Sequence, residues 1–95
     1  MKIKFEWDEE KNDANLFKHG VTFEKAATVF KDKRAIILYD DAHSQDEDRF
    51  IVIGREQKLQ MLTVCHCWRY NDTVIRIISA RKANAKERKM YEEQI

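Results

Sequence analysis

The chain has 95 residues, 37% of them charged and 43% hydrophobic, so we expect one domain over residues 1–95 with a thin core under a heavily solvated or partner-facing surface. No apolar run is long enough to span a bilayer, and the first residues alternate charged and apolar side chains, unlike a signal peptide. We therefore expect a cytoplasmic protein with no membrane partner, whose two cysteines stay reduced.

Positive charge is concentrated in the second part of the sequence, although the net charge is only +1. Residues 1–56 hold 10 Lys and Arg against 13 Asp and Glu, whereas residues 57–95 hold 8 against 4. Between Val74 and Lys89, six basic residues accompany a single acid, Glu87. Such asymmetry is the usual footprint of a polyanion-binding surface. A solvated helix face would give the same charge run, so both interpretations stay open.

The N-terminal third predicts a strand followed by two short helices. Residues 2–7 alternate strictly between charged and apolar side chains, which is typical of a half-buried strand. Asp8 is placed to cap a helix that runs to His19, and Gly20 supplies the left-handed position at its end. Thr22 is placed to cap the second helix, so the two helices should form an angled pair.

The rest of the chain predicts four strands and a closing helix. Apolar runs at residues 35–39, 49–55, 59–68 and 73–80 are separated by polar segments, and residues 83–91 are rich in helix formers. Strands joined by short turns pair antiparallel. Because strands and helices segregate along the chain, the fold class is α+β. We expect an N-terminal strand and two helices, then an antiparallel sheet of about four strands, with the C-terminal helix packed on one sheet face.

The strand at residues 74–81 carries two arginines in an otherwise apolar run. Unpaired buried charge is costly, so either this strand has one wet face or its arginines serve a site. Regular alternation places Arg76 on the same side as Ile78 and Ala80. It places Arg81 at the end of the sheet where the closing helix begins. Arg81 is therefore the stronger site candidate, and Arg76 is either a supporting residue or a phosphate contact.

Two groups of residues suggest metal chemistry at first inspection. In the segment Cys65-His66-Cys67 the two cysteines share one strand face and the histidine points to the other, so the three do not form one ligand set or a nucleophile–base pair. We expect the cysteines to be small core side chains. The acidic loop 40–48 lacks the spacing and the central glycine of a calcium loop, and we interpret it as mobile and solvated. The sequence predicts neither a metal nor a cofactor.

Basic and aromatic residues near the C-terminus point to chemistry on RNA instead. Metal-free RNA cleavage needs a base for the ribose 2′-hydroxyl and cations for the charge that develops on the phosphate. Arg88 and Tyr91 share a helix face by their spacing, and Arg81 lies near the same end of the sheet. The alternative is that Arg49 and Arg76 pair with acids across strands and that Tyr91 belongs to the core.

Short motifs that cover nearly the whole chain carry a family resemblance. They comprise Phe5-Glu6-Trp7-Asp8, Asn15, Lys18 to Glu24, Ala26 to Phe30, Glu47, Arg49, Gly54, Ile75 to Arg81, Glu87, Arg88 and Tyr91. In this order they resemble the BrnT family, which are toxins of type II toxin–antitoxin systems. The resemblance implies a RelE-like fold and a metal-independent endoribonuclease, acting through the ribose 2′-hydroxyl, that inhibits translation.

The resemblance also implies partners and a set of site residues. The implied partners are an RNA substrate and a BrnA-like ribbon–helix–helix antitoxin in a toxin–antitoxin hetero-oligomer, with operator DNA bound only through the antitoxin. The expected catalytic residues are His19 as base, Arg81 and Arg88 on the phosphate, and Tyr91 to position or protonate. The expected RNA-binding residues are Lys18, Arg49, Arg76 and Lys82. The residues by themselves make His19 a helix-capping histidine before a catalyst. A non-catalytic partner-binding module, or a degenerate toxin that acts as co-repressor, is the alternative function.

Overall fold

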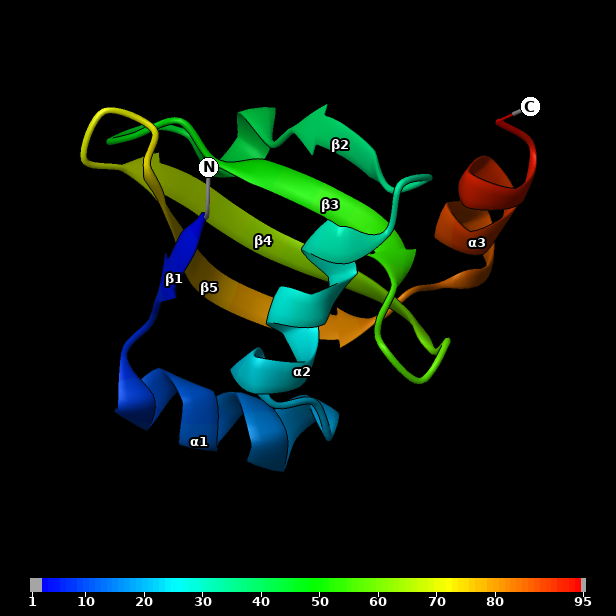
Figure 1. Cartoon of the computed structure of the whole chain (residues 1–95), viewed down its shortest axis with the longest axis horizontal. Coiled ribbons are helices and arrows are strands. Elements are labelled where there is room, and N and C mark those ends of the chain that lie inside the picture. Colours follow the sequence, from blue (N-terminus) through cyan, green and yellow to red (C-terminus); the bar gives the residue numbers. More distant parts are fainter. Residues whose placement is uncertain (1–2, 95) are drawn as a thin grey trace.

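A sheet and three α-helices make up the described part of the chain, residues 3–94, in a computed structural model (Figure 1). The elements are β1 (Lys4–Glu6), α1 (Glu9–His19), α2 (Phe23–Ala27), the 3₁₀ helix η1 (Thr28–Lys31), β2 (Ile36–Tyr39), the 3₁₀ helix η2 (Asp41–His43), β3 (Phe50–Arg55), β4 (Met61–Arg69), β5 (Val74–Lys82) and α3 (Ala85–Glu92). The predicted α+β class and the predicted order of elements are confirmed. None of the helices in this part of the chain has the length and apolar character needed to cross a membrane.

The sheet has five strands in the order β1-β5-β4-β3-β2. Strands β3 to β5 pair antiparallel with their neighbours in sequence, as expected from their short connections, and β2 pairs antiparallel with β3 through the longer segment that contains η2. The prediction of about four strands in an antiparallel sheet was wrong in one respect, because β1 joins the sheet as a fifth strand, parallel to β5. The two strands are adjacent in space but far apart in sequence, so local turn signals could not reveal their pairing.

Capping residues fix both ends of α1 and the start of α2 where the sequence predicts them, and a further cap, not predicted, starts α3. The side chain of Asp8 accepts hydrogen bonds from two backbone amides in the first turn of α1, and Gly20 ends the helix with a φ of 71°. Thr22 caps α2 in the same way as Asp8 caps α1. Asn84 and Glu87 form a reciprocal capping box at the start of α3.

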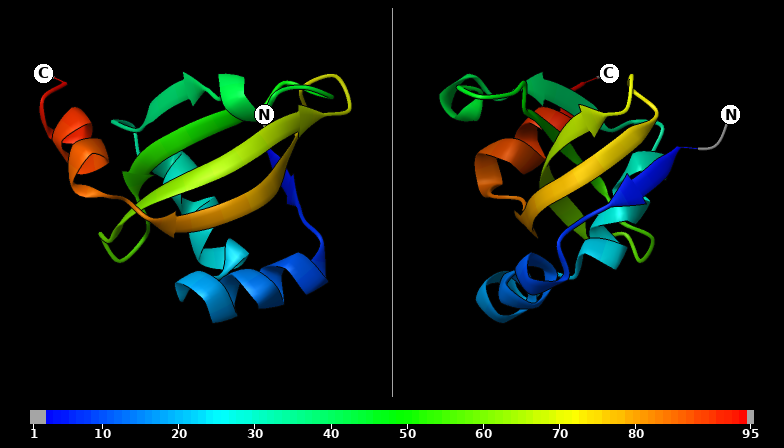
Figure 2. Two further views of the ribbon diagram at one scale, coloured as in Figure 1. Left: turned by 180° about the vertical axis from the view of Figure 1, so that it is seen from behind. Right: turned by 90° about the vertical axis from the view of Figure 1, so that its left-hand side faces the viewer.

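Helix α1 lies along the β5 edge of the sheet, and α2 with η1 covers one face of it (Figure 1). The main core lies between them and the sheet, because apolar side chains alternate along each strand toward the helices. Its buried members are Val21, Phe23, Ala26, Val29, Val52, Leu62, Val64, Ile75, Ile77 and Ala80. The other face of the sheet has no helix across its middle, and only α3 lies against one end of it (Figure 2, left). One face of the sheet is therefore open.

A buried asparagine joins α1 to β5. Strand β1 pairs only with residues 74–76, so the edge of β5 beyond them has no strand partner. The side-chain amide of Asn15 donates to the carbonyl of Ala80 at 2.8 Å and accepts from its N–H at 3.1 Å, as a neighbouring strand would. The same amide nitrogen also donates to the carbonyl of Val21 at 2.8 Å. Asn15 thus satisfies three backbone groups on two other segments of the chain.

A β-bulge changes which side chains of β5 face the open side. The pairing of β4 with β5 shifts midway along the strands, so Ile78 has no residue opposite it. The prediction that Ala80 shares a side with Arg76 was wrong, because regular alternation stops at the bulge. Ala80 packs in the core, and Arg81 lines the open face. If the same residues of β5 alternated regularly with no bulge, Arg81 would point into the apolar core.

Candidate functional site

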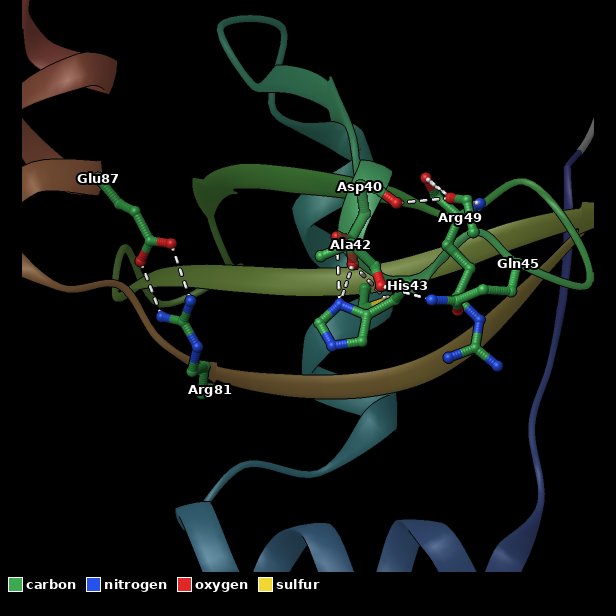
Figure 3. A network of polar contacts seen from close by, with 9 residues as sticks. Asp40, Ala42, His43, Gln45, Arg49, Arg81 and Glu87 are labelled. Atoms are coloured by element: carbon green, nitrogen blue, oxygen red, sulfur yellow. Dashed lines mark hydrogen bonds and ion pairs between the residues drawn. The ribbon is translucent and has the colours of Figure 1, made fainter.

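The open face of the sheet holds a cleft of about 210 Å³. Its walls come from the η2 segment, from the start of β3, from the first half of β4 and from the second half of β5 (Figure 3). The lining residues are Asp40, His43, Arg49, Ile51, Thr63, Cys65, Ile78, Ser79 and Arg81. The cleft therefore combines an imidazole, two guanidinium groups and an apolar floor.

An aspartate–histidine pair stands on one side of the cleft. The Nδ1 of His43 lies 3.1 and 3.0 Å from the two carboxylate oxygens of Asp40. Asp40 is buried, whereas the side chain of His43 is 68% exposed. The carboxylate fixes the ring orientation and stabilises a positive imidazolium. Nε2 of His43 has no hydrogen-bond partner among residues 3–94, so it is free to exchange a proton with a bound molecule.

The η2 segment is held by its own hydrogen bonds. The hydroxyl of Ser44 accepts from the N–H of Arg49 at 3.0 Å and donates to the carbonyl of Asp40, and the N–H of Asp40 donates to the carbonyl of Arg49 at 2.8 Å. Residues 41–43 of the predicted loop thus form a short helix, and its residues are solvent-exposed as predicted. The pair Asp40 and His43 was missed in the sequence. Its spacing of three residues, which places two side chains on one side of a helical turn, is the signal that could have found it.

A second ion pair stands on the opposite side of the cleft (Figure 3). Arg81 donates to both carboxylate oxygens of Glu87, at 2.7 and 2.8 Å. Glu87 also accepts from the hydroxyl of Thr63 at 2.9 Å and from the N–H of Asn84 at 2.9 Å. These hydrogen bonds, that of Arg81 foremost, lower the pKa of Glu87 to about 2 against the opposing effect of burial. The capping box of α3 thereby holds a cation at the edge of the cleft.

The substitution Glu87→Gln is expected to lower the free energy of unfolding by about 1–2 kcal/mol at pH 7, since it removes a charge-assisted pair whose arginine is partly exposed. The folded-state pKa of Glu87 lies below its ordinary value of 4.5, so its contribution is complete above pH 4.5 and disappears as the pH falls toward 2. Urea unfolding of both proteins between pH 7 and pH 2 measures this difference. A gap between the two proteins that stays constant over this range would contradict the assignment.

The remaining predicted arginines of the sheet differ in their pairing. Arg49 lines the cleft, and its nearest acid, Glu47, is 3.9 Å away and closer to Arg69, at 3.0 Å. Arg76 pairs with Glu6 of the neighbouring strand at 3.0 Å. The alternative of cross-strand pairing therefore holds for Arg76, whereas Arg49 keeps its guanidinium beside the cleft.

Tyr91 does not reach the cleft. Its side chain is buried against Ile53 and Met61, and its hydroxyl donates to Asp32 at 2.7 Å. Burial would raise the pKa of Asp32, but hydrogen bonds from two backbone amides and from Tyr91 hold that pKa below its ordinary value. Tyr91 thus has the core position that was the alternative to its predicted catalytic role.

Four other predicted residues lie on the surface and do not line the cleft. Lys18 and His19 end α1, Lys82 ends β5, and Arg88 lies on α3; all four are exposed. Arg88 donates to the carbonyl of Ala83 at 2.7 Å. The structure therefore brings Arg49 and Arg81 together in one cleft and leaves these four outside it.

The segment 65–67 does not supply a nucleophile to the cleft. As predicted, Cys65 and His66 face opposite sides of the sheet: Cys65 lines the cleft, and His66 packs fully buried against Phe30, with ring centres 4.8 Å apart. Burial, together with nearby Asp40, raises the pKa of Cys65 to about 11, so its thiol is neutral at physiological pH. Among residues 3–94, no three His, Cys, Asp or Glu side chains gather as a metal site would require.

Comparisons with known proteins place the chain in a family. The family model described as "Ribonuclease toxin, BrnT, of type II toxin-antitoxin system" matches residues 7–87. The 1.1 Å crystal structure of the Brucella abortus ribonuclease toxin BrnT superposes with a TM-score of 0.65 and 25% sequence identity, over 87% of this chain and 99% of that chain. No curated protein matched the chain in sequence. The chain therefore belongs to the BrnT family of ribonuclease toxins from type II toxin–antitoxin systems.

Proposed function

We propose that the chain is a metal-independent endoribonuclease that cleaves RNA by attack of a ribose 2′-hydroxyl, and that the cleft on the open sheet face is its active site. One observation carries this assignment: the Asp40–His43 pair shares a cleft with Arg49 and Arg81. The family of ribonuclease toxins supplies the substrate class. An imidazole with an orienting carboxylate and two cations are the groups that this reaction needs.

In the proposed reaction, Nε2 of His43 takes the proton of the 2′-hydroxyl as the 2′ oxygen bonds to the adjacent phosphorus. The bond from phosphorus to the 5′ oxygen breaks, and the departing oxygen takes a proton from water, which reaches the open cleft. Arg49 and Arg81 stabilise the charge on the phosphorane. Glu87 occupies one edge of the Arg81 guanidinium and leaves N–H groups of the other edge for the phosphate. The products are a 2′,3′-cyclic phosphate and a 5′-hydroxyl.

The exposed basic residues outside the cleft fit a path for the RNA backbone. Lys18, His19, Lys82 and Arg88 are solvent-exposed and belong to elements around the carboxyl end of β5. Cations of this kind hold phosphates through long-range attraction that weakens with added salt. In this proposal they bind the RNA, whereas the residues of the cleft cut it.

A type II system implies an antitoxin as the protein partner. We propose that this antitoxin is BrnA-like, that its ribbon–helix–helix part binds the operator DNA, and that the released toxin acts in the cytoplasm to inhibit translation. The family supports the pairing, and the open cleft is accessible to a covering protein. A non-catalytic co-repressor is the competing function, and growth separates the two. Expression of the chain without its antitoxin should arrest growth if it is a toxin and should be harmless if it is a co-repressor.

The purified chain, freed of antitoxin, is expected to cut single-stranded RNA at an unchanged rate after EDTA is added. Cleavage should leave 2′,3′-cyclic phosphate ends, because the ribose supplies the nucleophile. The measurement is gel analysis of a labelled RNA, with end groups identified by mass spectrometry. A matched oligonucleotide with 2′-deoxyribose at the cleavage position is the control and should stay intact. Loss of activity in EDTA that returns with Mg²⁺, or equal cleavage of the control, would refute the proposal.

A further inference from the structure

The two edges of the sheet differ in how well they are protected. One edge is β1, a strand of three residues with Lys4 and Glu6 among them. The other edge is β2, whose side chains include Ile37, Leu38 and Tyr39, exposed by 58%, 38% and 51%. No described element pairs with the outer side of β2. Edge strands are usually protected by shortness, charge, proline or a bulge, and the four residues of β2 include no charge, proline or bulge.

The hydrogen-bond pattern of β2 defines which backbone groups point outward. The N–H of Asp40 donates to the carbonyl of Arg49, so this residue directs its backbone groups toward β3. In an antiparallel pair the direction alternates from residue to residue. The backbone N–H and C=O of Ile37 and Tyr39 therefore point away from β3, where a further strand would bind them.

The charges that flank β2 have opposite signs at equal distances in sequence from Ile37. Lys33 and Arg34 precede the strand, and Asp40 and Asp41 follow it. If a second β2 runs antiparallel and Ile37 faces Ile37 of the other copy, the basic turn before β2 of each copy lies beside the acidic segment that follows β2 of the other. Lys33 of one copy then lies within reach of Asp41 of the other. Lys33 and Asp41 are both exposed. The same register puts outward-pointing residues opposite each other, as a hydrogen-bonded antiparallel pair requires.

We propose that β2 is a self-association edge: two copies of the chain pair through antiparallel β2 strands about a two-fold axis at Ile37. The direction of the backbone groups permits this register, the exposed apolar side chains supply contact area, and the flanking charges favour an axis at Ile37. A two-fold contact uses the same patch twice, which explains why the patch is complementary to itself. Pairing joins two five-stranded sheets into one continuous sheet. This inference does not depend on the chemistry of the cleft.

The proposed pairing also links the two clefts. Asp41 begins η2, the short helix that carries His43. Lys33 of one copy therefore lies beside the segment that forms the cleft of the other copy. The surface between the two clefts is then continuous across the shared pair of strands, and an RNA held on one copy meets the cations of the other.

Sedimentation velocity of the full chain, freed of antitoxin, tests the association from about 1 to about 100 μM protein. The wild-type chain is expected to form a concentration-dependent dimer. Ile37→Lys places two like charges face to face at the axis and is expected to weaken the dimer at least about tenfold. Phe17→Lys, at a residue 96% exposed on α1, is the matched control and should dimerise as the wild type does. A wild-type chain that stays monomeric, or a dimer that Ile37→Lys leaves intact, would overturn the proposal.

A charge swap tests the register independently of any effect on folding. Lys33→Asp and Asp41→Lys are each expected to weaken the dimer, and the double variant is expected to restore it. Residues 33 and 41 lie at opposite ends of β2 within one chain, so restoration reports a contact between copies. A double variant no tighter than the single variants would overturn the register. Hydrogen exchange that is slowed in β2 only when antitoxin is present would show that the antitoxin takes this edge instead.

Discussion

His43→Ala is expected to lower kcat for RNA cleavage by about 10²–10⁴-fold, the usual contribution of a general base. The fold should be unchanged, because the side chain of His43 is 68% exposed and its contacts are confined to η2. The measurement is single-turnover cleavage of a labelled RNA under saturating protein. Asp40→Asn should give a smaller loss, since the ring keeps a partner but loses the charge that stabilises the imidazolium.

His19→Ala is the matched control for the histidine assignment. His19 is exposed at the end of α1, outside the cleft, so its removal should affect RNA affinity and leave the single-turnover rate at saturation nearly unchanged. If His19→Ala abolishes cleavage and His43→Ala does not, the base lies at the end of α1 and the cleft is not the active site. Circular dichroism of both variants shows whether a loss reflects unfolding.

Asn15→Ala is expected to lower the free energy of unfolding by about 3 kcal/mol or more. The substitution removes three buried hydrogen bonds and leaves the backbone groups of Ala80 and Val21 without their partner. Urea unfolding followed by tryptophan fluorescence measures the change. Asp13→Ala, at an exposed residue of the same helix, is the control and should change stability by less than about 0.5 kcal/mol.

A small effect of Asn15→Ala would mean that water replaces the amide at the edge of β5. In that case α1 would be held mainly by the hydrogen bonds of Asn12 to Phe23 and Glu24. Equal destabilisation by Asp13→Ala would instead indicate that α1 is sensitive to any substitution, and the hydrogen bonds to Ala80 would not be its main attachment.

Local features of the fold could be predicted because local physics determines them. The caps Asp8 and Thr22 lie at helix starts because their side chains bond the free amides there, and short turns force neighbouring strands to pair antiparallel. The parallel pairing of β1 with β5 was not predictable in this way, because neither segment contains a local signal that identifies a strand partner so far away in sequence. The bulge at Ile78 contains no glycine that would indicate it in the sequence, so the assumption of regular alternation placed Ala80 on the wrong face.

The candidate site was predictable only in part. Arg81 was identified because a charge in an apolar strand needs a reason, and Arg49 was identified through the family resemblance. His43 was missed because it lies among acids in a segment that reads as solvated, and only the folded η2 brings it against Asp40. Tyr91 was placed with the cations because helix spacing gives a residue's face but not what that face contacts. The spacing of residues in the sequence determines the direction of side chains within one helix or strand. The packing of helices and strands against each other determines which side chains become neighbours.

The bulge in β5 has a consequence for aligning related sequences. On either side of Ile78, side chains alternate regularly, with Ile77 and Ala80 in the core and Ser79 and Arg81 at the cleft. A chain that lacked one residue at this point would lose the bulge and keep every other side chain on its present face. A gap of one residue at Ile78 is therefore the physically correct alignment for a shorter relative. Deletion of two residues at this point would instead direct the side chain of Arg81 into the core.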